Sequence, residues 1–167
     1  MRILETGRLA LDELVPADAP FILELVDSPA FRDNIGDRGV RDLDGARGYI
    51  EGVALSYAKH GFGLWRATLK ATGEPVGICG LVKRDGLDLP DVGYALLQRF
   101  WGQGFATEAA AAVLAHGHRM LDLPVISAIT KPANLGSIAV LEKIGLKFLG
   151  LRVLPGSDSE SSYFETA

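Results

Sequence analysis

The sequence predicts a single domain with an α+β or mixed α/β fold, and three observations point to it. Strand-like apolar segments alternate with helix-like segments whose apolar residues recur every three or four positions. Forty-eight per cent of the 167 residues are hydrophobic, enough to bury a core of ordinary size. A glycine-containing turn, RFWGQGFATEA, joins an apolar strand-like stretch to an alanine-rich helix-like one. The predicted order is strand, two helices, three strands, helix, strand, helix and two strands, in a single domain spanning 1–167.

The first elements follow from apolar spacing. Alternating leucines predict a strand over 8–14. An apolar stripe over Phe21–Val26 predicts a first helix. A second helix is expected over 44–59 and ends at Gly61, a residue suited to a helix C-terminus. The polar, glycine-containing stretch 31–44 between the two helices predicts a loop.

The middle of the chain is predicted to be mostly β. The segments 62–70 and 76–83 flank the turn sequence ATGEP, which indicates an antiparallel hairpin. A further strand is expected over 91–97, after the turn sequence RDGLDLP. The alanine-rich segment 105–121 then carries a single apolar stripe and predicts a helix.

The last segments complete the predicted order. A continuously apolar run predicts a buried strand over 124–130, and a short helix is expected over 134–146. Two strands over 149–154 and 162–164 enclose the polar loop PGSDSES. No change of composition and no repeat marks a second domain.

Charge and hydropathy exclude several classes of protein. The formal net charge is −4 and the pI is about 5.4, so the chain has no general attraction for DNA or for an anionic membrane. No apolar run approaches the roughly 18 residues of a membrane span. The first residues carry charges throughout and lack the apolar region of a signal peptide. We therefore expect a cytoplasmic protein that binds neither DNA nor membrane.

The cysteine and histidine residues give no sign of a metal site. Cys79 is the only cysteine, which excludes an internal disulfide and a cysteine-based metal cluster, and suits a reducing cytoplasm. It lies in the apolar segment VGICGLV, so we expect it in the core. His116 and His118 would face apart on a helix, and His60 is distant in sequence. No metal is therefore expected.

Gly102 and Gly104 indicate an anion-binding turn. The first N–H groups of a helix have no internal partner, and the helix dipole places partial positive charge there. A glycine allows an anion to approach the backbone closely. The dinucleotide fingerprint GxGxxG/A would need Gly or Ala where this chain has Thr107, and the P-loop pattern is absent. The turn therefore predicts an anion held mostly by backbone, without the usual nucleotide signatures.

Residues Arg99–Gly104 fit the pattern R/Q-x-x-G-x-G/A and resemble the diphosphate loop of the GNAT superfamily of acetyl-CoA-dependent N-acetyltransferases. The surrounding sequence DVGYALLQRFWGQGFATEA resembles the fourth strand and third helix of that family. NLGSIAVLEKIGLKFLG resembles its later helix and the strand that follows. ETGRLAL resembles the first strand of the branch of ribosomal-protein N-terminal acetyltransferases (RimJ/RimL-like). The resemblance implies a mostly antiparallel twisted sheet with a splayed pair of parallel strands, flanked by helices.

The resemblance also implies acetyl-CoA as the donor substrate. The splayed strands would be Gly93–Leu97 and Ile126–Ile129, with the pantetheine arm of CoA between them and the diphosphate on the amides that follow. Cofactor contacts are implied for Ala95, Leu96, Arg99, Gly102, Gln103, Gly104, Phe105, Ala106, Asn134 and Ser137.

Several of these residues also have a purely structural explanation. Asn134 is a good N-cap for the helix that it precedes, and Ser137 would then be the third residue of that helix. Arg99 has the character of a solvated surface cation. Glu108 favours a first helical turn through the helix dipole alone.

The catalytic residues depart from the family pattern. Many members carry a tyrosine seven residues after the asparagine, where it protonates the departing thiolate, but this position holds Leu141. Ser137 is the first replacement, followed by Tyr94 and Tyr163. The thiol of CoA should have a pKa near 8.5, so a weak acid suffices. Asp91 is the candidate base for the attacking amine, and a backbone N–H near Ala95 or Leu96 would stabilise the oxyanion.

The acceptor is not identified by the sequence. The resemblance implies a primary amine, and a peptide N-terminus, an amino acid, a polyamine and an antibiotic all stay open. The acceptor site is expected at 31–42, Tyr57 and 155–161. Alternatives are a different acyl-CoA donor, a CoA-binding module without turnover and a mononucleotide-binding protein. Homodimers are common in the family.

Overall fold

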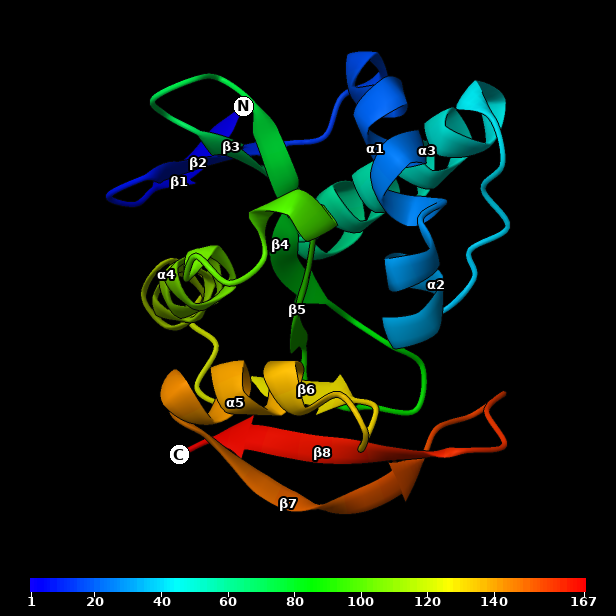
Figure 1. Cartoon of the computed structure of the whole chain (residues 1–167). Coiled ribbons are helices and arrows are strands. Elements are labelled where there is room, and N and C mark those ends of the chain that lie inside the picture. Colours follow the sequence, from blue (N-terminus) through cyan, green and yellow to red (C-terminus); the bar gives the residue numbers. More distant parts are fainter.

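The computed structural model describes residues 1–167 and contains an eight-stranded sheet in the order β1-β2-β3-β4-β5-β6-β8-β7 (Figure 1). All neighbouring strands are antiparallel except β5 and β6, which are parallel. The strands are β1 (Arg2–Glu5), β2 (Leu9–Glu13), β3 (Leu64–Leu69), β4 (Pro75–Val82), β5 (Asp91–Leu96), β6 (Ser127–Thr130), β7 (Leu146–Val153) and β8 (Glu160–Thr166).

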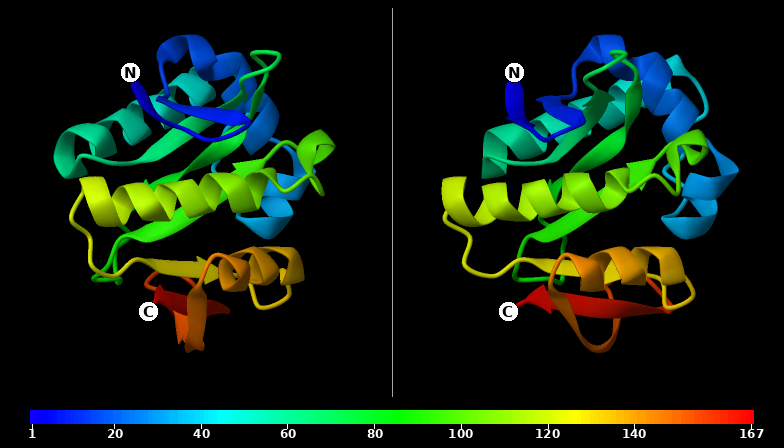
Figure 2. Two further views of the ribbon diagram at one scale, coloured as in Figure 1. Left: turned by 90° about the vertical axis from the view of Figure 1, so that its left-hand side faces the viewer. Right: turned by 60° about the vertical axis from the view of Figure 1, so that its left-hand side comes forward.

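The helices cover both faces of this sheet. They are α1 (Ala19–Val26), α2 (Pro29–Asn34), α3 (Leu43–His60), α4 (Phe105–Met120) and α5 (Leu135–Lys143). In Figure 1, α4 lies on one side of β4 and β5, and α1, α2 and α3 lie on the other. Helix α5 packs against β6 and β7. The two termini lie at opposite ends of the molecule (Figure 2). The mixed α+β fold with one splayed parallel pair is therefore confirmed.

The N-terminal half differs from the prediction at two places. Residues Arg2–Glu5 form an edge strand that was not predicted. It forms because its backbone N–H and C=O groups pair with β2, and it was missed because its polar and apolar side chains alternate only weakly. Within the predicted loop 31–44, the first residues belong to α2. That helix forms because Ser28 Oγ accepts a hydrogen bond from the Phe31 amide at 3.1 Å and because Phe31 is buried.

Element ends in the C-terminal half are also shifted. Helix α5 ends at Lys143 within the predicted segment 134–146, and Gly145, expected just past the end of the helix, has a φ of 102° and turns the chain. Leu146 is buried and begins β7, which therefore starts earlier than the predicted 149. Strand β6 occupies only Ser127–Thr130 of the predicted 124–130.

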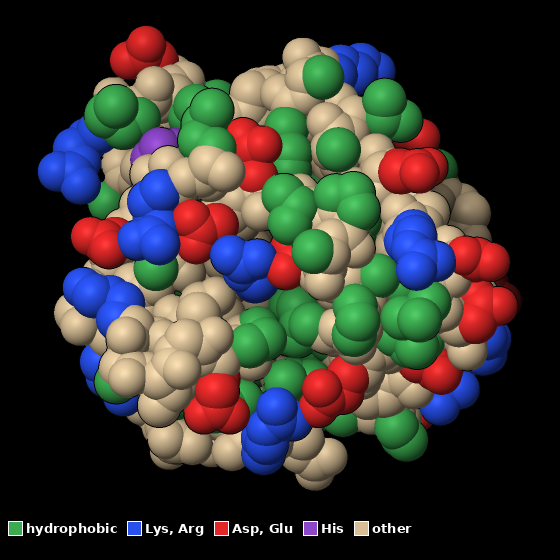
Figure 3. Space-filling model, turned by 90° about the horizontal axis from the view of Figure 1, so that it is seen from above, with side chains coloured by type: hydrophobic (Ala, Val, Ile, Leu, Met, Phe, Trp, Pro, Cys, Tyr) green, Lys and Arg blue, Asp and Glu red, His purple; other side chains and the backbone are tan.

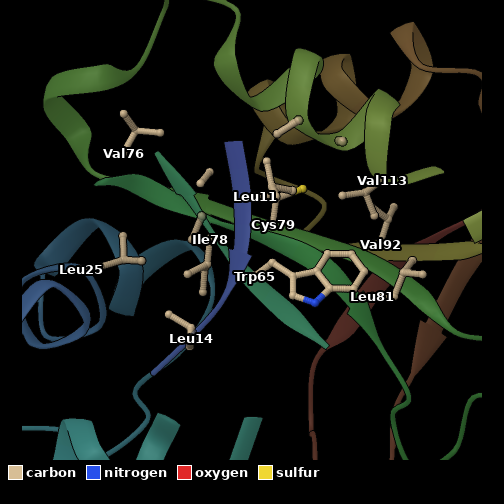
Figure 4. Packing of buried hydrophobic residues seen from close by; sticks show 14 of the residues in the cluster. Leu11, Leu14, Leu25, Trp65, Val76, Ile78, Cys79, Leu81, Val92 and Val113 are labelled. Carbon is tan, nitrogen blue, oxygen red and sulfur yellow. The ribbon is translucent and has the colours of Figure 1, made fainter. Parts of the chain in front are cut away.

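Burial in the core explains the almost continuously apolar sequence of β4. Strand β4 is buried on both faces because helices cover each of them. In the register of the sheet, Trp65 lies beside Cys79, which lies beside Tyr94, so these three side chains share one face. The indole of Trp65 meets His116 of α4 edge-on, with 5.5 Å between ring centroids. Cys79 is fully buried in this core, as predicted (Figure 4).

The surface has no single-sign charged face in the view from above. Figure 3 shows acidic and basic side chains interspersed around hydrophobic ones. None of the helices combines the length and the apolar character that crossing a membrane requires.

Candidate active site

Strands β5 and β6 diverge immediately after they meet. Their parallel pairing consists of Asp91 beside Ser127, with the Ser127 amide donating to the Pro90 carbonyl at 2.9 Å. Beyond this point β6 pairs only with β8. The opened sheet edge of β5 therefore faces a space that no strand fills.

That space is part of a cavity of about 870 Å³. Its walls come from β5, the turn before α4, α5, and the segments around α2 and before β8. The predicted site residues that line it are Tyr94, Ala95, Leu96, Gly102, Gly104, Phe105, Ala106, Asn134 and Ser137. Three predicted residues, Asp91, Arg99 and Gln103, do not line it.

The glycine turn presents a row of free amides. Gly102 and Gly104 have φ values of 76° and 82°, a left-handed conformation that favours glycine. The amides of Gly102–Thr107 donate to no backbone or side-chain acceptor of the chain, and the Glu108 amide is the first to be satisfied, by the Gly104 carbonyl at 3.0 Å. A Cβ at Gly102 would meet no atom within 4 Å. The turn therefore offers six N–H donors at a helix N-terminus in open space.

Arg8 and Glu108 stabilise this turn, and no sequence pattern around Arg8 predicts that role. Glu108 accepts hydrogen bonds from the Thr6 hydroxyl at 2.5 Å and from Arg8 Nε at 2.8 Å. The same guanidinium donates to the Gln103 carbonyl at 3.0 Å and lies 4.2 Å from the centroid of the Phe105 ring. Partial burial raises the pKa of Glu108, but the hydrogen bonds from Thr6 and Arg8 outweigh it and lower that pKa overall. Glu108 thus stabilises the turn as an ionised carboxylate.

Backbone direction on β5 distinguishes Leu96 from Ala95. The Leu97 amide donates to the Val76 carbonyl of β4 at 2.9 Å, so the backbone groups of Leu97 point toward β4. Those of Ala95, two residues earlier on the same strand, point toward β4 as well. Because backbone groups alternate along a strand, the groups of Leu96 point away from β4. Its carbonyl accepts a hydrogen bond from Trp101 Nε1 at 3.0 Å. The Leu96 amide therefore faces the opening between β5 and β6.

Tyr94 and Ser137 meet in the cavity. The Tyr94 hydroxyl lies 2.9 Å from Ser137 Oγ and 3.2 Å from the Ser137 carbonyl oxygen, and its one proton can go to either acceptor. Burial raises the pKa of Tyr94 to about 12, although the hydrogen bond with Ser137 opposes this, so the phenol is protonated at neutral pH. Asn134 caps α5 by accepting from the Ser137 amide at 3.2 Å. Leu141, at the position of the family tyrosine, is buried.

Asp91 lies beside Arg84 instead of in the cavity. Its carboxylate is 1% exposed, and both oxygens accept from Arg84 Nε, at 3.1 and 3.0 Å. Burial raises the pKa of Asp91 to about 6, against the opposing charge of Arg84. This position does not suit the predicted role of a base that contacts the amine.

Other predicted residues also lie away from the cavity. Arg99 forms an exposed ion pair with Glu24. The Tyr163 hydroxyl donates to Glu165 at 2.7 Å. The Tyr57 hydroxyl accepts from the Leu14 amide at 3.1 Å and donates to the Leu64 carbonyl, which makes it a link between α3 and the sheet.

The predicted acceptor segments do reach the cavity. Five residues of α2 and the loop after it line it, namely Ala30, Phe31, Asn34, Ile35 and Arg38, and the last four lie within the predicted segment 31–42. Residues of the loop before β8 and of its first positions line the same cavity, namely Leu154, Ser157, Ser159, Glu160 and Ser161. No group of three His, Cys, Asp or Glu side chains is placed to hold a metal ion.

Comparison with known proteins agrees with this architecture. Residues 8–147 match the family described as the acetyltransferase (GNAT) domain. The uncharacterized protein YkkB of Bacillus subtilis (strain 168) is 34% identical over 112 residues, which cover 66% of this chain and 65% of YkkB. The chain thus spans slightly less than two thirds of that relative.

Solved structures share the fold over the whole chain. The acetyltransferase from Agrobacterium tumefaciens str. C58 superposes with a TM-score of 0.84 at 29% identity, covering 98% of this chain and 93% of that one. RimL, the ribosomal L7/L12 alpha-N-protein acetyltransferase solved with coenzyme A, has a TM-score of 0.84 at 18% identity, covering 99% and 97%. With the family match across most of its length, the splayed β5–β6 pair and the open glycine turn, this chain belongs to the GNAT family of N-acetyltransferases.

Proposed function

We propose that the chain transfers the acetyl group of acetyl-CoA directly to a primary amine while both are bound. The observation that carries this proposal is the single cavity that joins the free amides of Gly102–Thr107, the open edge of β5 and the Tyr94–Ser137 pair. Bound acetyl-CoA supplies an acetyl thioester. The residues below bind it, orient it and manage protons.

The turn fits a diphosphate. Six N–H donors and the positive end of the α4 dipole are the groups that hold phosphate oxygens in proteins. The space around Gly102 leaves room for them. Arg8 adds positive charge next to Gly104, since a Cβ at Gly104 would lie 3.4 Å from Arg8 Nη2. The Leu96 amide is the donor placed to bind the carbonyl oxygen of a pantetheine or acetyl group.

Ser137 and Tyr94 take the place of the family tyrosine. The Ser137 hydroxyl donates its proton toward the leaving sulfur, and the neutral Tyr94 hydroxyl donates to Ser137 Oγ in turn. A thiol with a pKa near 8.5 is an acceptable leaving group even for a weak acid. This pair therefore suffices without a tyrosine at Leu141.

The cavity lacks a strong base, which favours an acceptor with a weakly basic amine. Glu160 is the only carboxylate in its walls, since Asp91 is turned into Arg84. An alkyl amine near pKa 10 is almost fully protonated at neutral pH, whereas the α-amine of a peptide N-terminus, near 8, is partly neutral. We therefore propose an α-amine acceptor, with a peptide N-terminus preferred to the more basic α-amine of a free amino acid. The α-N-protein activity in the name of the RimL neighbour supports including peptides.

The proposal is tested by thiol release from acetyl-CoA with three acceptor sets: L-amino acids, short peptides and alkyl amines such as putrescine. We expect turnover with α-amines, acetylated product by mass spectrometry, and intersecting double-reciprocal plots when both substrates are varied. Parallel plots would indicate a covalent acetyl-enzyme. Binding of acetyl-CoA without thiol release in any set would favour a CoA-binding module without turnover.

A further inference from the structure

One wall of the cavity carries two arginines and a tyrosine, Arg38, Arg84 and Tyr49, here called the arginine wall. They come from the loop after α2, the turn before β5, and α3. All three side chains line the same cavity, and the positive charges of Arg38 and Arg84 both act to lower the pKa of Tyr49, which burial raises. Three separate segments therefore bring hydrogen-bond donors to one place.

These donors have no acceptor within the chain. Arg84 uses only Nε, toward Asp91, and its two terminal nitrogens form no hydrogen bond. Arg38 forms neither a hydrogen bond nor an ion pair, and the neighbouring Asp37 forms its ion pair with Arg41. The Tyr49 hydroxyl likewise has no partner in the chain.

An arginine without an ion pair, such as Arg38, is unusual in this protein. Eight arginines are ion-paired: Arg2, Arg8, Arg32, Arg41, Arg47, Arg66, Arg84 and Arg99. Of the three others, Arg119 and Arg152 lie outside the cavity and only Arg38 lines it. The chain carries a net charge of −4, yet this wall is positive.

The buried Asp91 makes Arg84 a fixed donor. The carboxylate is 1% exposed and holds Nε with both oxygens, whereas the arginine side chain is 31% exposed. A guanidinium held at one end loses little further freedom when it binds a ligand. Asp91 thus acts as a positioning residue for Arg84.

The arginine wall is distinct from the diphosphate turn. Asp91, which holds Arg84, lies five residues before Leu96 on β5, about 17 Å along the strand. Gly93 lies between these ends, and a Cβ there would meet only Leu64 Cδ2, at 3.7 Å. The face of β5 that carries the Gly93 position is therefore open to an acceptor.

We infer that the acceptor carries a carboxylate in addition to its reacting amine, and that Arg38, Arg84 and Tyr49 bind this carboxylate. The inference rests on the proposed function and names its substrate class. Arginine forks and a hydroxyl are the groups that bind a planar carboxylate with charge-assisted hydrogen bonds. Two sources fit: the α-carboxylate of an amino acid or dipeptide, and an acidic side chain near a peptide N-terminus.

The test compares matched acceptors. Dipeptides are assayed against their C-terminal carboxamides, whose N-terminal amines have similar pKa values, and Ser-Asp-amide against Ser-Asn-amide. We expect kcat/KM to be about 10- to 100-fold higher for members with a carboxylate. The first series reports a terminal carboxylate and the second an acidic side chain. Equal rates within both series would overturn the inference.

Variants of the arginine wall test whether its residues cause the preference for acceptors with a carboxylate. Arg38→Met and Tyr49→Phe should raise KM for the carboxylate acceptors about 10-fold or more. They should leave kcat, KM for acetyl-CoA and the carboxamide rates nearly unchanged. Arg119→Met is the matched control, an unpaired arginine outside the cavity. A KM increase of the same size for acids and amides would overturn the assignment.

A binding measurement separates this inference from the proposed function. N-acetylglycine and N-acetyl-Ser-Asp-amide are titrated by calorimetry into the protein loaded with CoA. Binding that is lost in Arg38→Met and kept in Arg119→Met supports the arginine wall even if no amine is acetylated. Absence of binding for both probes overturns it, whereas absence of thiol release with every amine overturns the proposed function.

Discussion

In the proposed mechanism, two hydroxyl groups, those of Tyr94 and Ser137, replace the tyrosine of the family pattern. Tyr94 comes from β5 and Ser137 from α5, and the cavity brings their oxygens to 2.9 Å. Ser137 is held by the helix cap at Asn134, which fixes the position of the first turn of α5. Because burial raises the pKa of Tyr94 to about 12, its phenol keeps at neutral pH the proton that the proposed mechanism donates to Ser137.

Removal of either hydroxyl should slow the chemistry. We expect Tyr94→Phe and Ser137→Ala each to lower kcat about 10- to 100-fold, with a KM for acetyl-CoA within a few-fold of the parent. The double variant should be little worse than the poorer single variant, since the two groups act together. Tyr163→Phe is the control, because its hydroxyl bonds Glu165. Full kcat in Tyr94→Phe would contradict the assignment.

At the scale of elements, the turn between β5 and α4 combines local and distant requirements. Two glycines supply the left-handed backbone that leaves the amides of Gly102–Thr107 unpaired. Arg8 of the N-terminal segment then holds that turn through Glu108 and the Gln103 carbonyl. The binding site for an anion is thus made by neighbours in sequence and stabilised by a residue about 100 positions away.

This arrangement predicts a specific loss on Gly104→Glu. A carboxylate in the turn would repel a diphosphate and fill the space in front of the amides, so acetyl-CoA binding should become undetectable by calorimetry. Gly73→Glu is a matched control: Gly73 has a φ of 78°, close to the 82° of Gly104, and lies in the β3–β4 turn outside the cavity. Both variants should lose similar stability. Unchanged binding in Gly104→Glu would show that the turn does not hold the cofactor.

At the scale of the whole molecule, one pair of residues joins two parts of the sheet. Strands β1–β5 form one part and β6–β8 the other, and they pair only at Asp91 and Ser127. The cavity exists because the remaining edge of β5 is unpaired. The buried ion pair of Asp91 and Arg84 lies at this joint, so its titration should be seen in global stability.

The pH dependence of unfolding tests this. Burial raises the pKa of Asp91 to about 6, so the folded chain binds this proton more tightly than the unfolded chain, where the value is near 3.8. The free energy of unfolding should therefore fall by about 3 kcal/mol as pH rises from about 4 to 6.

Asp91→Asn should flatten this part of the curve, measured by urea unfolding at pH 4, 5, 6 and 7. Asp37, whose pKa is lowered to about 2, titrates below the window. Parallel curves for parent and variant would contradict the assignment.

The sequence by itself was informative where the signal is local. Helix periodicity, the cap at Asn134 and the stop at Gly61 all lie within a few residues of the feature that they determine. The same holds for the glycine turn, and the family pattern around it predicted the fold class and the splayed strands. Local patterns did not identify β1, which depends on pairing with β2, or α2, which depends on the burial of Phe31.

Only the tertiary structure decided which side chains meet. Asp91 stands next to the cavity in sequence, but its side chain is directed into Arg84, and Arg99 is paired with Glu24, 75 positions away. Arg8 and Tyr49 carry no motif that marks them, and Arg38 was expected only as part of the acceptor segment 31–42. Contacts between segments distant in sequence depend on how the sheet and helices pack, because packing brings residues together without leaving a periodic signal in any one of them.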